Sequence, residues 1–149
     1  MGESLTPDIE LVNAGTTVAA ELGLLMATTE ATIAWRRGDR ATVQAMAEVV
    51  RRARGVTGEA MATMVVEMLA GAMDESARAR GREVVRRALD AGLPRLALEA
   101  LALGWGDGSA GREQREIARR LAEEVPRARW GARLGALSAE ECLRRMGQG

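Results

Sequence analysis

The sequence predicts an all-α protein, an array or bundle of about four helical hairpins with seven to eight helices, in a single domain over residues 1–149. A Glu-apolar-apolar-Arg-Arg-apolar motif begins at Glu48, Glu83, Glu116 and Glu141. The starts are 35, 33 and 25 residues apart (83−48, 116−83 and 141−116), and a period near 34 is typical of stacked helical hairpins. No alternation of polar and apolar residues is present, so no strand is expected.

The first helices have recognisable start and stop signals. Thr6-Pro7-Asp8 suits a helix start, because Thr caps, Pro fits the first turn and Asp favours the positive end of the helix dipole. This helix is expected to run to Arg37, where Gly38-Asp39 stops it. The next three helices are expected over 40–54, ending at Gly55, over 57–73, capped by Thr57, and over 77–91, ending at Gly92.

Prolines and glycines divide the C-terminal half in the same way. Pro94 opens a short helix to Leu103, and the Gly-rich segment 104–109, which contains Trp105, has the composition of a loop. Ser138-Ala139-Glu140-Glu141 has the form of a capping box. Helices are therefore expected over 94–103, 110–124, 126–137 and 139–147.

Two kinds of helix alternate along the chain. One kind is apolar almost all round, and the other carries the repeated motif, in which Glu precedes Arg by three and four residues and can pair with it on one exposed face. We expect the apolar helices to lie inside or on a concave side, with the motif helices packed outside them. The apolar helices cover 11–35, 57–73, 96–104 and 128–137.

This organisation resembles the tetratricopeptide type of helical repeat over about residues 30–147. With Pro94 and Pro126 taken as the prolines that close a repeat, large, large, small and aromatic positions fall on Leu98, Leu101, Ala102 and Trp105. The second helices depart from the pattern, since Arg82 and Gln114 stand where small residues are expected. The resemblance implies a scaffold or chaperone that holds a peptide or helix in a groove.

Composition narrows the classes of function. Phe, Tyr, His and Lys are absent, a bias that fits a designed (de novo) origin as well as a natural one. Without His and with only Cys142, we expect no metal site, no cofactor and no Ser-His or Cys-His catalysis, hence no enzyme. The single Cys fits a reducing, cytoplasmic setting, and Met1-Gly2-Glu3-Ser4 lacks the basic region of a secretory signal.

The distribution of charged residues limits the kinds of partner that the protein is expected to bind. Arg residues are interleaved with Glu, which cancels the field that nucleic-acid binding needs. Glu21 and Glu30 interrupt the apolar segment 11–35, so no membrane span is expected. Residues 1–75 carry 6 Arg and 11 acids (6−11 = −5), and residues 76–149 carry 15 Arg and 10 acids (15−10 = +5). Such a dipolar chain could associate head to tail as a homo-oligomer.

Methionine, tryptophan and buried carboxylates supply the candidate binding residues. Met61, Met64 and Met68 share one helical face, and Met adapts to apolar helices or flat ligands, although core packing would explain the same pattern. Carboxylates within apolar helices could hold a cation or guanidinium, or find an Arg of a neighbouring helix. The further candidates are Met26, Trp35, Trp105, Glu67 and Glu21.

Two functions remain open at this point, and a designed fold without a function is a third alternative. The first is a non-enzymatic scaffold or chaperone-like protein that binds a peptide or an amphipathic helix of another protein through an apolar Met/Trp surface. The second is a helical bundle that encloses an apolar small molecule. An open groove would favour the first function, and a closed cavity lined by Met and Thr the second.

Overall fold

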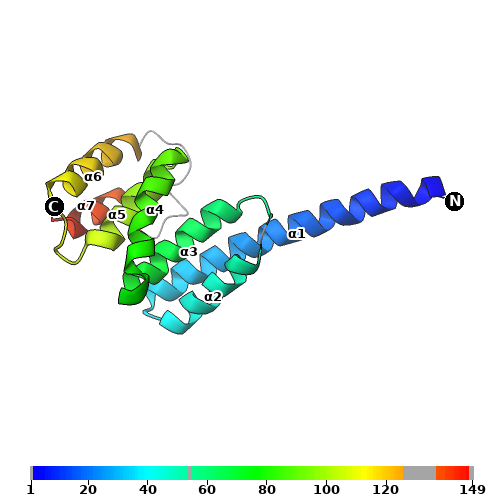
Figure 1. The fold of residues 1–149 in the computed structure, drawn as a ribbon, viewed down its shortest axis with the longest axis horizontal. Coiled ribbons are helices and arrows are strands. Elements are labelled where there is room, and N and C mark those ends of the chain that lie inside the picture. The colour runs from blue at the N-terminus through cyan, green and yellow to red at the C-terminus, as the bar shows by residue number, and fades with distance from the viewer. Residues whose placement is uncertain (1, 54, 126–136, 148–149) are drawn as a thin grey trace.

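The computed structural model shows helices throughout the part of the chain that it describes, which comprises residues 2–53, 55–125 and 137–147, with side chains from Val18 onward (Figure 1). Among these residues no strand is present, so the all-α expectation is confirmed. The helices are α1 (Gly2–Arg36), α2 (Arg40–Arg52), α3 (Glu59–Met73), the short 3₁₀ helix η1 (Glu75–Ala77), α4 (Arg78–Asp90), α5 (Pro94–Trp105), α6 (Arg112–Glu124) and α7 (Ala139–Arg145).

The helices form an array in which each one packs against its neighbour in sequence. In addition, α3 packs against α1, α5 against α3, and α7 against α5, so these four helices form a continuous inner row. Helices α2, α4 and α6 lie outside this row. Because α3 and α5 are apolar around most of their circumference, they are stable only when other helices cover them on several sides.

The core runs along this inner row. Leu69 of α3 is fully buried, and Leu98 and Leu101 of α5 are each only 1% exposed. The outer helices contribute one narrow face each: α2 buries Val43, Ala47 and Val50 and leaves the charged residues of its motif, Glu48, Arg51 and Arg52, in solvent. The expected inside and outside positions are thus confirmed for these helices.

Helix α7 differs from that expectation. It carries the fourth copy of the motif, yet it lies in the inner row, where Cys142 is fully buried and Met146 is 3% exposed. Its capping box is present: the Glu141 amide donates to the Ser138 hydroxyl over 3.1 Å. The apolar helix expected over 126–137 lies outside the described residues, apart from Leu137.

Several boundaries differ from the expected ones for local reasons. Helix α1 begins at Gly2, so Pro7 lies within its second turn and does not mark its start. Gly58, at a φ of 88°, is the N-cap residue of α3, the position that was expected for Thr57. The Glu59 carboxylate in the first turn accepts a hydrogen bond from the Gly55 amide. Helix α5 continues through Trp105, because the ring packs against the core and holds the last turn.

A pair of glycines brings α3 and α4 into close contact. A Cβ atom added to Gly71 would lie 3.0 Å from the Gly81 Cα atom and 3.0 Å from the Ala77 carbonyl oxygen. One added to Gly81 would lie 3.2 Å from both the Gly71 Cα atom and the Glu67 carbonyl oxygen. Glycine inside a helix costs about 1 kcal/mol relative to Ala, and here the close backbone approach explains its use.

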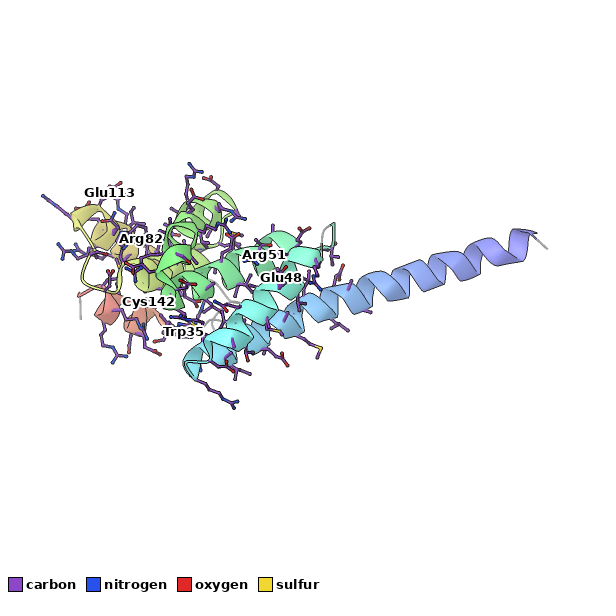
Figure 2. All side chains as sticks on the ribbon, turned by 60° about the horizontal axis from the view of Figure 1, so that its bottom comes forward. Trp35, Glu48, Arg51, Arg82, Glu113 and Cys142 are labelled. Carbon is purple, nitrogen blue, oxygen red and sulfur yellow. The ribbon has the colours of Figure 1, made fainter. Side chains whose placement is uncertain are left out.

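The motif residues of α2 form a solvated pair. The Arg51 guanidinium lies 2.7 Å from the Glu48 carboxylate, and both side chains are more than half exposed (Figure 2). Exposed ion pairs contribute little, since water and salt screen them. We expect Arg51→Ala to lower the free energy of unfolding by less than about 1 kcal/mol, measured by urea denaturation. A loss of several kcal/mol would place this guanidinium in a buried network.

Candidate functional site: the exposed face of α1

Helix α1 has two apolar faces, and only one of them is covered. Leu24, Ala27, Ala31 and Ala34, spaced three and four residues apart, are all at most 4% exposed and face α2 and α3. At 3.6 residues per turn, the positions between them fall on roughly the opposite side of the helix. That side carries Val18, Leu22, Leu25, Met26, Thr29 and Ile33, which we call the α1 face.

The α1 face is exposed along its whole described length. Leu22 and Leu25 are 53% and 50% exposed, and Met26 is 65% exposed. Single apolar side chains on a surface are normal, but large ones that follow one another along one helix face mark an interaction site. The N-terminal part of α1 continues away from the other helices (Figure 1), so the α1 face is open at that end.

The polar groups on this face have internal partners. The Thr29 hydroxyl donates to the Leu25 carbonyl oxygen over 2.8 Å, and the Thr28 hydroxyl donates to the same oxygen over 2.9 Å. Because the Thr29 hydroxyl already donates a hydrogen bond within α1, Thr29 can turn its methyl group toward an apolar partner without leaving that hydroxyl unpaired. The α1 face is therefore compatible with a dry contact.

The predicted methionine surface is divided between solvent and core. Met61 is 50% exposed, whereas Met64 and Met68 are 4% and 2% exposed and belong to the core. Met61 lies in the first turn of α3, before the contacts that Glu67 and Gly71 make with α4. The structure therefore does not bring the three methionines together on one accessible surface, and Met26 lies on a different helix from them.

The two described tryptophans are half-buried and stacked against guanidinium groups. The Arg82 guanidinium carbon lies 4.8 Å from the centre of the Trp105 ring, and that of Arg145 lies 5.3 Å from the Trp35 ring. Arg82 also donates to the Gly104 carbonyl oxygen over 2.7 Å. These contacts tie α4 to the end of α5 and α7 to the end of α1, so both rings serve packing between helices.

Two of the carboxylates within apolar helices are paired with arginines. The Glu67 carboxylate lies 2.7 Å from the Arg87 guanidinium of α4, which is the expected pairing with an Arg of a neighbouring helix. Glu99, only 3% exposed, accepts from Arg95 of its own helix over 3.1 Å. Glu21 is half-buried and lies on α1 beside Leu22 of the α1 face.

The buried thiol of Cys142 is unreactive at neutral pH. Burial and, as a smaller cause, the nearby Glu99 carboxylate together raise the pKa of Cys142 to about 12, because both disfavour the thiolate. A thiol that stays protonated at neutral pH is neither a nucleophile nor a ready metal ligand. Among the described residues, no group of three or more Cys, Asp or Glu side chains is placed to hold a metal ion.

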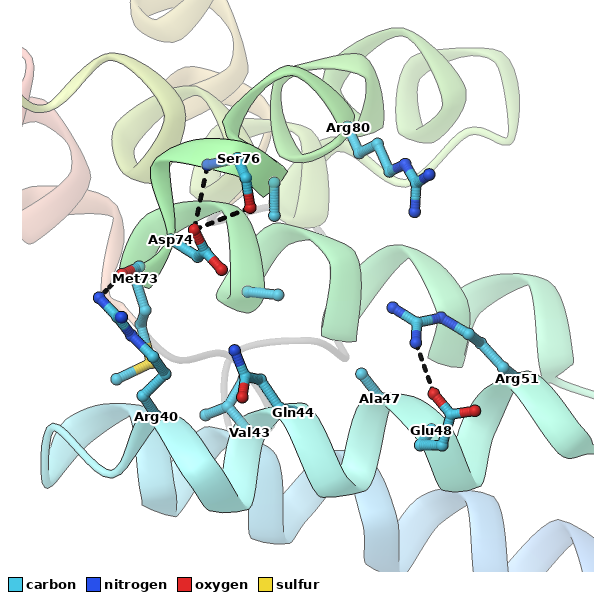
Figure 3. Close-up of a pocket in the computed structure, with 12 residues that line it drawn as sticks. Arg40, Val43, Gln44, Ala47, Glu48, Arg51, Met73, Asp74, Ser76 and Arg80 are labelled. Atoms are coloured by element: carbon cyan, nitrogen blue, oxygen red, sulfur yellow. Dashed lines mark hydrogen bonds and ion pairs between the residues drawn. The ribbon is translucent and has the colours of Figure 1, made fainter.

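An open, polar groove of about 420 Å³ lies between α2 and the α3–α4 connection (Figure 3). Arg40 donates from one end of the groove to the Met73 carbonyl oxygen over 2.7 Å, and Arg80 points over the groove from α4. Hydrogen bonds from Ser76 hold the pKa of Asp74 below its usual value. Because both arginines and acids line the groove, it has no strong electrostatic field of one sign. The α1 face is therefore the stronger candidate for a binding site.

No family model, curated protein or solved structure compared with this chain gives a match. In the described residues, no helix combines the length and the hydropathy that crossing a membrane requires.

The repeated motif does not reveal the α1 face, although the residues of this face lie in the apolar segment 11–35. A helix that is apolar all round has no polar side to show which residues face out. Only the packing of α2 and α3 against Ala27 and Ala31 reveals that Leu25 and Met26 remain uncovered.

Proposed function

We propose that this protein is a non-enzymatic scaffold that binds an amphipathic helix of a partner along the α1 face. The supporting observation is the row of exposed apolar side chains from Val18 to Ile33 on one rigid helix. A helical partner would present its own apolar stripe to this row, with anchors three or four residues apart. The exposed side chain of Met26 would adapt to partners of different shape.

We further propose that the array is a tetratricopeptide-like repeat. The inner row of α1, α3 and α5, with α2 and α4 outside it, has the alternation of inner and outer helices that such repeats have. In this proposal the partner helix extends the inner row at its open, N-terminal side. The groove beside α2 and a second cavity beside Trp35 are both open to solvent rather than enclosed, which favours helix binding over the enclosure of an apolar small molecule.

A charge placed in the α1 face tests this proposal. A fluorescein-labelled synthetic amphipathic helix with a Leu stripe is the probe, and its fluorescence anisotropy is the readout. Leu25→Glu should weaken binding at least about tenfold, because a carboxylate cannot be desolvated in an apolar contact without a partner. Far-ultraviolet circular dichroism should stay unchanged, since Leu25 is half exposed.

Two further variants complete the test. Leu89, 41% exposed on α4, is the matched control, and Leu89→Glu should leave binding of the probe unaltered. Met64→Glu, in contrast, should unfold the protein, because Met64 is only 4% exposed. Equal binding by wild type and Leu25→Glu would refute the α1 face as the binding surface.

A further inference from the structure

The α1 face is self-complementary under a twofold rotation. Its positions are paired about a point between Leu25 and Met26: 25 and 26, 22 and 29, and 18 and 33 each add up to 51. Two antiparallel α1 helices crossing at that point would therefore place Leu25 against Met26, Leu22 against the Thr29 methyl group, and Val18 against Ile33. An interface that uses the same patch on both partners is the usual geometry of a homodimer.

The spacing and length of the contact suit an antiparallel pair of helices. Val18, Leu22, Leu25 and Thr29 follow at steps of four, three and four residues, and so do Leu22, Met26, Thr29 and Ile33. Both rows therefore lie on one side of the helix, and the twofold rotation exchanges them. Residues 15–36 of each helix would overlap, because 51−36 is 15, and this overlap is about 33 Å long at about 1.5 Å per residue.

Charge favours the antiparallel direction. The first 35 residues contain no Arg and carry five acids, three of them (Glu3, Asp8 and Glu10) in the first turns of α1. The antiparallel arrangement carries these turns past the end of the partner's α1 helix, where the chain has Arg36 and Arg37. A parallel pair would bring all five acids level with their own copies, whereas the antiparallel pair does so only for Glu21 and Glu30 (21+30 = 51). The acidic α1 segment also disfavours an anionic membrane surface as the occupant.

We propose that the helix bound by the α1 face is α1 of a second copy of this chain, in an antiparallel homodimer with its axis between Leu25 and Met26. This inference rests on the proposed helix-binding function and specifies the partner. The other helices of each copy do not obstruct it, because they pack against the opposite side of α1, at Leu24, Ala27, Ala31 and Ala34.

Disulfide trapping tests both the dimer and its direction. We would prepare Val18→Cys and Ile33→Cys as separate variants, mix them, and oxidise them under mild conditions. The mixture should form an 18–33 disulfide between chains, whereas each variant alone should form little, because equivalent positions lie about 22 Å apart along an antiparallel pair (15 residues at about 1.5 Å). The native Cys142 is fully buried and should not compete.

Sedimentation velocity of the full chain supplies the second measurement. Wild type should sediment as a dimer at about 10–100 µM, a range suited to a short seam. Leu25→Glu should raise the dissociation constant at least about 100-fold, and Leu89→Glu should not change it.

Each adverse outcome has a distinct meaning. Disulfides in the single variants would show a parallel pair and overturn the antiparallel geometry. Wild type that stays monomeric while binding the synthetic helix would overturn the homodimer and leave the proposed function standing. Wild type that does neither would overturn both, and binding to phosphatidylserine vesicles by a monomer would assign the α1 face to a membrane instead.

Discussion

Replacement of Leu101 by Ala should lower the free energy of unfolding by about 2–5 kcal/mol. The side chain is 1% exposed at the centre of α5, a helix that α3, α4, α6 and α7 contact. Neighbours held on several sides cannot collapse into the space that the removed atoms leave, so the variant loses both the transfer free energy and the contacts around a cavity. Urea denaturation followed by circular dichroism measures the loss.

Leu69→Ala should have an effect of the same size. Leu69 is fully buried in α3 and stands 32 residues before Leu101 (101−69), at the equivalent place of the proposed repeat. Leu89→Ala is the control, since that side chain is 41% exposed and should cost less than about 1 kcal/mol. A near-neutral result at Leu69 or Leu101 would contradict the equivalence of the two positions.

Gly71→Ala should lower the free energy of unfolding by about 1–3 kcal/mol, although Ala is the better helix former. The added methyl group would lie 3.0 Å from the Gly81 Cα atom and 3.0 Å from the Ala77 carbonyl oxygen. Both are backbone atoms that cannot rotate away, so α4 must shift as a whole and loosen its contacts with α3. The midpoint of urea unfolding reports the effect.

Gly23→Ala is the matched control for this experiment. Gly23 also lies inside a helix, but nothing would stand within 4 Å of its added Cβ atom. The substitution should therefore raise the free energy of unfolding by about 0.5–1 kcal/mol through helix propensity alone. Opposite signs at the two glycines are the expected pattern. A stabilising effect at Gly71 would contradict the close approach of α3 and α4.

The positions of most helices could be predicted because local chemistry determines them. Gly38 and Gly92, at φ values of 74° and 72°, end helices as expected, because the left-handed backbone costs glycine nothing. Ser138 and Glu141 form the expected capping box. The narrow apolar face of α2 likewise predicted that helix's outer position, since a polar side must remain in water.

Tertiary structure alone decided which apolar side chains are accessible. Met61 and Met64 are three residues apart on one face of α3, yet Met61 is 50% exposed and Met64 is 4% exposed, because the neighbouring helices cover one side chain and not the other. In α1, the adjacent residues Met26 and Ala27 differ in the same way, because Met26 is 65% exposed and Ala27 is 4% exposed. Hydrophobic periodicity reports a face only where polar residues mark the other one, and α1 and α3 have too few of these. For these two helices, the neighbours determine which side chains are buried and which remain free to bind.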